Sequence, residues 1–159
     1  MAKHKIWNID SAAKEVANLW GGIKGEQLAM MKTYIQVTKY KKGEIIYENG
    51  TIPKEAMYLL AGKVKIYKDG INGKSQIIRV IKPSEFLGFR AYFANEAYRT
   101  AAMALDNCVV AHFPMKVLMK MLQSSYNIGF YFIKYLSIEI GKSDDRTVNL
   151  TQKHIRARL

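Results

Sequence analysis

The feature that most constrains the fold of this 159-residue chain is a run of short β-rich segments. In each segment, β-branched and aromatic residues cluster over a few positions and then stop at Gly, Pro, Asn or Asp, which is typical of strands joined by tight turns. Strands this short and regularly spaced predict a β-barrel, sandwich or jelly-roll core. The segments are residues 34–40, 44–50, 56–62, 63–70 and 75–83, with a last strand at 107–113.

Helical patterns lie before this run. Residues 10–20 carry apolar positions at helical spacing, with Asp10 or Ser11 as the N-cap and Gly21-Gly22 as a stop. A second short helix is expected over residues 25–32. We therefore expect an N-terminal helical segment (1–33) followed by a β-roll domain (34–114).

Apolar residues recur at three- and four-residue steps over residues 115–149, which predicts a long helical region broken near residues 124–127. Aromatic and apolar residues cover most of the helix circumference between Phe130 and Tyr135, so this helix should be buried on two sides. Burial by its own β-roll and by a second copy of the chain predicts a homodimer, with intramolecular burial alone as the alternative. The expected dimer positions are Leu122, Ser125, Gly129, Phe132, Ile133, Leu136 and Ile140.

The charge and cysteine content limit the partners and the compartment. Lys and Arg total 25 against 13 acidic residues, a net charge of +12, which indicates an anionic partner or simply a solvated basic surface. The single cysteine, Cys108, allows no intramolecular disulfide and favours the cytoplasm. Without a signal-peptide pattern or a long apolar run, we expect a soluble protein with no membrane partner.

Four motifs give the chain a resemblance to a known family. They are "YKKGEIIYENG", "MYLLAGKVKIYKDG", "FLGFRAYFANEAYRTAA" and "DDRTVNLTQKHIRARL". In this order they resemble the Crp/Fnr transcription regulators from about Tyr34 to Leu159. The resemblance implies a mainly β fold, a cyclic-nucleotide-binding-like double-stranded β-helix (jelly roll) with short N-terminal helices and a long C-terminal dimerisation helix.

The resemblance also implies how the chain ends. Residues 150–159 would contain a hinge, near Asn149 to Thr151, and the start of a winged helix-turn-helix domain that is truncated here. That domain would bind DNA in the full-length regulator. The basic residues Lys142, Arg146, Lys153, Arg156 and Arg158 suit contacts to DNA phosphates, or form a solvated face.

The third motif resembles the family's phosphate-binding cassette. Gly88 and the pair Arg99-Thr100 match family positions that hold the cyclic phosphate, and the backbone N–H groups of residues 88–91 could complete an anion nest. Arg90 is a second possible cation or a solvated side chain. The alternative for Arg99 is an ion pair with Glu96 or a bond to a backbone carbonyl.

The ribose half of the cassette departs from the family. Phe89 stands where nucleotide-binding members carry the glutamate that holds the ribose hydroxyl, and the dimer helix offers Glu139 and Ile140 where cyclic-AMP-responsive members place small hydroxyl residues. Ordinary cyclic AMP is therefore a poor fit, and a different small anionic or nucleotide-like effector is expected. The aromatic residues Phe86, Phe89, Tyr92, Phe93 and Tyr98 either line a ligand cavity or form core.

Other chemistry finds little support. Cys108 and His112 are four residues apart, about 13 Å along a strand, so they would not ligate one haem iron from the same side. Three scattered histidines make no metal cluster, and we expect no metal and no enzyme activity. The sequence thus predicts the effector-sensing and dimerisation portion of a Crp/Fnr-like regulator. The alternative is a stand-alone ligand-binding or protein-interaction module without DNA binding.

Overall fold

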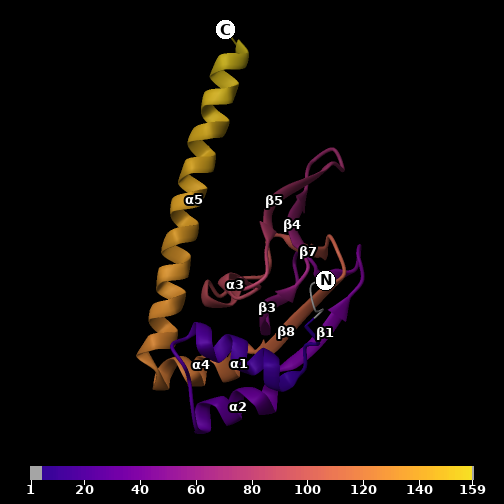
Figure 1. Cartoon of the computed structure of the whole chain (residues 1–159). Coiled ribbons are helices and arrows are strands. Elements are labelled where there is room, and N and C mark those ends of the chain that lie inside the picture. The colour runs from indigo at the N-terminus through magenta and orange to yellow at the C-terminus, as the bar shows by residue number, and fades with distance from the viewer. Residues whose placement is uncertain (1–4, 159) are drawn as a thin grey trace. The chain divides into compact units, whose positions relative to one another are not determined.

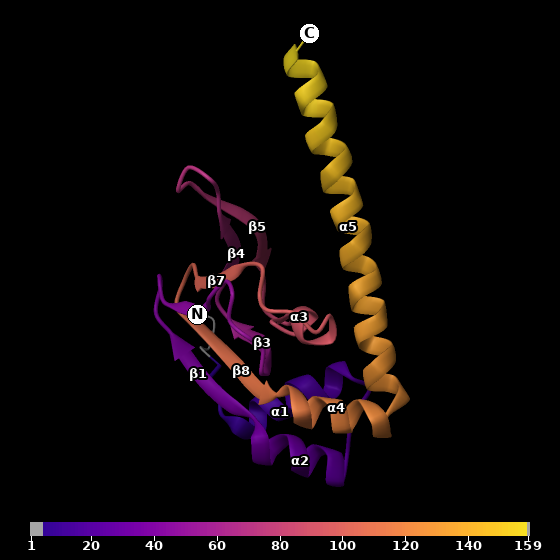
Figure 2. The same ribbon diagram turned by 180° about the vertical axis from the view of Figure 1, so that it is seen from behind.

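A computed structural model gives the structure of residues 5–158 (Figure 1). The chain divides into two compact units, Met1–Met121 and Leu122–Leu159. Within the first unit, both views place helices α1 and α2 at one end of the strands (Figures 1 and 2). The helices are α1 (Ile9–Leu19), α2 (Glu26–Tyr34), α3 (Arg90–Phe93), α4 (Met115–Ser124) and α5 (Tyr126–Arg158). The strands are β1 (Gln36–Tyr40), β2 (Ile45–Tyr47), β3 (Glu55–Ala61), β4 (Val64–Asp69), β5 (Ser75–Ile81), β6 (Phe86–Leu87), β7 (Ala101–Ala104) and β8 (Cys108–Pro114).

The strands form two antiparallel four-stranded sheets, in the orders β1-β8-β3-β6 and β2-β7-β4-β5. This is the predicted jelly-roll fold with flanking helices. The core between the sheets is apolar, and its burial supplies the main stabilisation of such a sandwich. Its buried members are Met57, Leu59, Val64, Ile66, Ile81, Leu87, Ala102, Ala104, Cys108 and Val110.

Strand β3 is buried on both faces, which shows that the first sheet is covered on its outer side as well. Side chains alternate along a strand, so Met57 and Leu59 face the core between the sheets and Tyr58 faces the opposite side. There Phe86 packs against Trp20 of the segment after α1, against Tyr58 and against Phe113, with ring centroids 5.7, 4.9 and 6.0 Å away. We call Trp20, Tyr58, Phe86, Phe89 and Phe113 the aromatic cluster.

The N-cap of α1 differs from the prediction. Asn8, not Asp10 or Ser11, caps the helix: its side-chain oxygen accepts a hydrogen bond from the Ser11 N–H at 2.8 Å, and the Ser11 hydroxyl accepts one from the Asn8 N–H at 2.9 Å. This reciprocal pair satisfies two backbone donors, which a cap at Asp10 would not. Asp10 instead pairs with Lys32 of α2 at 3.0 Å, and this lysine lowers the pKa of the Asp10 carboxyl.

The helical region after Pro114 breaks where the sequence predicts, since α4 ends at Ser124 and α5 begins at Tyr126. Across the residues expected to contain a hinge, near Asn149 to Thr151, α5 is continuous and extends to Arg158. The Thr151 hydroxyl donates to the Thr147 carbonyl at 2.9 Å, so it bonds back within the helix and does not act as a new N-cap.

Gly62, in the turn between β3 and β4, offers a test of the packing. Its φ is +90°, and a Cβ there would lie 2.6 Å from the Asn107 carbonyl oxygen and 2.7 Å from the Cys108 Sγ. We expect Gly62→Ala to lower the free energy of unfolding by about 3 kcal/mol, from backbone strain plus overpacking. Denaturant unfolding would measure it.

Gly43→Ala is the matched control, because Gly43 has a φ of +88° but nothing within 4 Å of its added Cβ. It should cost only the strain, about 1–2 kcal/mol. Equal losses in the two variants would show that the close approach at Gly62 does not matter.

Candidate functional site

The cassette predicted to hold an anion lies between β6 and β7 of opposite sheets. After Leu87 the chain passes through Gly88 with a φ of +80°, turns through the short helix α3, and reaches β7 by way of residues 94–100. Sequence patterns did not predict α3, because a four-residue helix has too few positions to show a period.

The surroundings of Gly88 are closely filled. A Cβ at this position would meet the methyl group of Met57 and would lie 3.1 Å from the Tyr98 hydroxyl, so only glycine fits. The Tyr98 hydroxyl donates a hydrogen bond to the Gly88 carbonyl at 3.0 Å, and the Tyr98 ring stacks on Tyr47 with centroids 4.0 Å apart. Burial raises the pKa of Tyr98, which keeps its hydroxyl protonated as a donor.

Phe89 is 3% exposed and packs into the aromatic cluster. Its ring lies 6.4 Å from Phe86 and 6.1 Å from Phe93. Burial confirms the core alternative for Phe86, Phe89 and Tyr98, whereas Phe93 is 41% exposed. The Phe89 side chain therefore packs in the core, and the aromatic cluster fixes its direction.

Arg90 and Arg99 meet at one carboxylate. Nη2 of Arg90 lies 2.7 Å from Oε1 of Glu96, and Nη2 of Arg99 lies 2.7 Å from Oε2 of the same residue. The hydrogen bond from Arg90 is the largest cause of a lowered pKa for Glu96. The ion pair between Arg99 and Glu96, given above as the alternative for Arg99, is thus confirmed. Arg90 has the same partner and is not merely solvated.

Thr100 is engaged with Tyr47 through a side-chain hydrogen bond. Burial is the main cause of a raised pKa for Tyr47, and the bond to Thr100 acts in the opposite direction. The structure therefore brings together Gly88, Tyr98, Tyr47 and Thr100 on one side of the cassette. The two arginines lie at the exposed surface with Glu96, because their side chains are 57% and 72% exposed.

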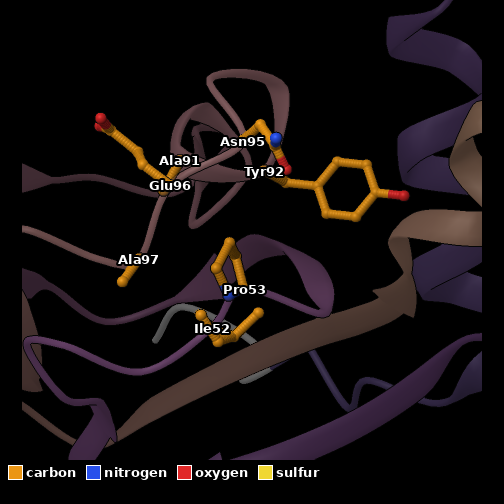
Figure 3. Close-up of a pocket in the computed structure, with 7 residues that line it drawn as sticks. All are labelled: Ile52, Pro53, Ala91, Tyr92, Asn95, Glu96 and Ala97. Carbon is orange, nitrogen blue, oxygen red and sulfur yellow. The ribbon is translucent and has the colours of Figure 1, made fainter.

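A pocket of about 380 Å³ opens beside the cassette (Figure 3). Two backbone hydrogen bonds tie Tyr98 to the loop that carries Ile52 and Pro53, Tyr98 N–H to Thr51 O at 2.9 Å and Gly50 N–H to Tyr98 O at 2.8 Å. Of the expected site residues only Tyr92 lines it, and in Figure 3 the Glu96 carboxylate points away from Tyr92 and Pro53. Its lining is Ile52, Pro53, Ala91, Tyr92, Asn95, Glu96 and Ala97.

Cys108 and His112 both have structural partners. The Cys108 thiol donates to the Lys63 carbonyl at 3.1 Å, and burial raises the pKa of this thiol. The His112 ring lies 2.9 Å from a Glu55 carboxylate oxygen through Nδ1 and 3.1 Å from the Tyr40 hydroxyl through Nε2. Within residues 5–158, no three His, Cys, Asp or Glu side chains gather as metal ligands would.

The positions expected to form a dimer separate into two groups. Phe132 is 3% exposed within one chain. Ile133 and Ile140 are each 63% exposed, and Leu122, Ser125, Gly129 and Leu136 are partly exposed. Glu139, proposed as a ligand contact, pairs with Lys142 at 3.1 Å. None of the helices described is long and apolar enough to cross a membrane.

Comparison with known proteins places the chain in a family. Residues 37–125 match the cyclic nucleotide-binding domain, which is more than half of the chain. The protein therefore belongs to the cyclic nucleotide-binding domain family. An uncharacterized protein of Haemophilus influenzae is 31% identical over 101 residues, which cover 63% of this chain and 78% of that protein.

Solved structures of transcription regulators share the fold. The catabolite activator protein of Thermus thermophilus superposes with a TM-score of 0.70 at 16% identity, over 84% of this chain and 62% of that chain. The chain thus spans 62% of the activator's length. The sensor domain of the transcriptional regulator DNR from Pseudomonas aeruginosa also gives 0.70, at 17% identity, over 86% of this chain and 93% of that domain.

Because Phe89 packs into the aromatic cluster, a carboxylate at this position should damage the fold. We expect Phe89→Glu to lower the free energy of unfolding by about 3 kcal/mol or more, since it removes a buried ring and buries a charge. Phe93→Glu, also on the cassette but 41% exposed, is the control and should cost far less. Denaturant unfolding distinguishes the two. A well-folded Phe89→Glu variant with tighter cyclic AMP binding would contradict this account.

Proposed function

We propose that this chain is the effector-sensing and dimerisation portion of a Crp/Fnr-like transcription regulator that acts in the cytoplasm. One observation carries the proposal. The chain belongs to the cyclic nucleotide-binding domain family, and its cassette has Gly88 and the pair Arg99-Thr100 between β6 and β7. The regulators with the same fold, although under 25% identical, are consistent with it. The effector binds at the cassette and acts only through its differential affinity for two dimer arrangements.

The effector in this proposal is a small anionic or nucleotide-like compound other than ordinary cyclic AMP. Phe89 supplies no acceptor for a ribose hydroxyl, and an unpaired buried hydroxyl costs about 1–3 kcal/mol, or tenfold to a hundredfold in affinity. Met57 and Tyr98 also fill the space beside Gly88. Glu139 is paired with Lys142, and Ile140 has no hydrogen-bonding side chain, so neither supplies the small hydroxyl that cyclic-AMP-responsive members place on this helix.

Two long helices pair in the proposed dimer. Along α5 the exposed Ile133, Ile140, Val148 and Ile155 recur at seven- or eight-residue steps, and Leu136 and Leu150 fall between them. This spacing is close to that of a coiled-coil seam. The basic residues from Lys142 to Arg158 would then lie near DNA, which the full-length protein binds through a domain after Leu159.

Thermal unfolding with and without ligand tests the effector site. We expect cyclic AMP and cyclic GMP to raise the melting temperature only at millimolar concentration, and Arg99→Ala to abolish the shift. A ligand at about ten times its dissociation constant stabilises by about 1.4 kcal/mol, enough for a shift of a few degrees. Lys68→Ala, which removes a positive charge from β4, is the control. An unchanged shift in Arg99→Ala, or no shift with any nucleotide, would contradict the proposed phosphate half-site.

Sedimentation velocity tests the helix pairing. We expect a dimer at micromolar concentration, and a monomer after Ile133→Asp with Ile140→Asp, because paired apolar side chains would be replaced by like charges. Ile71→Asp is the control, since Ile71 is fully exposed in the β4–β5 turn. A wild-type monomer, or a double variant that remains a dimer, would overturn this interface.

A second candidate is a stand-alone ligand-binding or protein-interaction module without DNA binding. The Haemophilus influenzae relative favours it, because the match spans 78% of that protein and leaves little length for a separate DNA-binding domain. A helix-turn-helix pattern encoded after Leu159 in the native gene would exclude this candidate. Its absence there would exclude the regulator.

A further inference from the structure

The contact between Arg90, Arg99 and Glu96 has the form of an occupied anion site. Each arginine donates to a different oxygen of one carboxylate, both at 2.7 Å. The arginines come from opposite ends of the cassette, Arg90 from the start of α3 and Arg99 from the segment before β7. Their guanidinium groups therefore converge on a space as small as one oxyanion.

A phosphate group suits this space at least as well as a carboxylate does. Guanidinium groups bind both anions through paired N–H donors, and a phosphate offers more acceptor oxygens and more charge. Two arginines and one glutamate leave the cluster with a net charge of 2 − 1 = +1. This residual charge favours a further anion at the cluster.

We propose that Arg90 and Arg99 form a two-arginine site for a phosphate or similar oxyanion, and that Glu96 occupies this site as an internal ligand. An incoming anion displaces the Glu96 carboxylate and takes over both arginines. The inference rests on the proposed function in taking this anion as part of the effector. It adds Glu96 to the site and gives this residue a regulatory part, that of lowering the affinity for the effector.

Displacement of Glu96 is physically inexpensive. Ion pairs of largely exposed side chains contribute little to stability, and the arginines here are 57% and 72% exposed, while Glu96 is 23% exposed. Glu96 lies in the loop between α3 and β7, so its side chain can turn away without breaking a strand pair. Because the arginines lower its pKa, Glu96 is charged at neutral pH and competes as an anion.

Calorimetric titration of three variants with inorganic pyrophosphate and with cyclic AMP tests this site. Glu96→Gln keeps the side-chain size and removes the competing charge, so it should bind pyrophosphate about threefold to tenfold more tightly than the wild type. Glu15→Gln is matched in charge and also removes one exposed ion pair, with Lys5 at 3.3 Å, and it should bind as the wild type does. Glu96→Gln with Arg90→Ala should lose the gain.

Equal pyrophosphate affinities in Glu96→Gln and Glu15→Gln would overturn the inference. So would a gain that survives Arg90→Ala. If circular dichroism shows that Glu96→Gln does not fold, Glu96→Ala replaces it, because it also removes the competing charge, and the same tighter binding is expected. A pyrophosphate gain without cyclic nucleotide binding in any variant supports the two-arginine site and counts against the nucleotide effector. Cyclic AMP binding that Glu96→Gln leaves unchanged overturns the inference and leaves the proposed function intact.

Discussion

The packing of Phe86 at the centre of the aromatic cluster joins three parts of the protein. Its ring contacts Trp20 from the end of α1, Tyr58 of β3 and Phe113 of β8. The residue itself begins β6, two positions before Gly88. The cassette therefore starts from a fixed point, since buried aromatic contacts combine a large apolar area with a preferred geometry.

The same packing extends to the residue after Gly88. Phe89 follows Gly88 directly, and its ring adds apolar burial to the cluster. On the other side of Gly88, Met57 and Tyr98 fill the space beside the glycine. Packed side chains therefore occupy most of the positions around Gly88. The charged residues of the cassette, Arg90, Glu96 and Arg99, form ion pairs nearer the surface and are not part of this packing.

The two ends of the long helix α5 differ in burial. Ile128 and Phe132 are buried, whereas the helix beyond Glu139 is exposed along its length and carries apolar residues among basic ones. A helix with an unpaired apolar seam is stable only when something covers it. Pairing with a second copy of the chain would satisfy this requirement.

The sequence by itself determined the jelly-roll class, the short helices before it, the break at Ser125 and the position of the cassette. These features depend on local periodicity, on turn residues and on motif spacing, all of which can be read along the chain. The tertiary structure decided the rest. The Asn8 cap, the continuous helix through Thr151 and the two bonds of Glu96 depend on which of several available partners each side chain takes. The direction of Phe89 depends on a cluster drawn from residues 20, 58, 86 and 113. Residues so far apart in the sequence come into contact only in the folded protein, so no local sequence pattern predicts that contact.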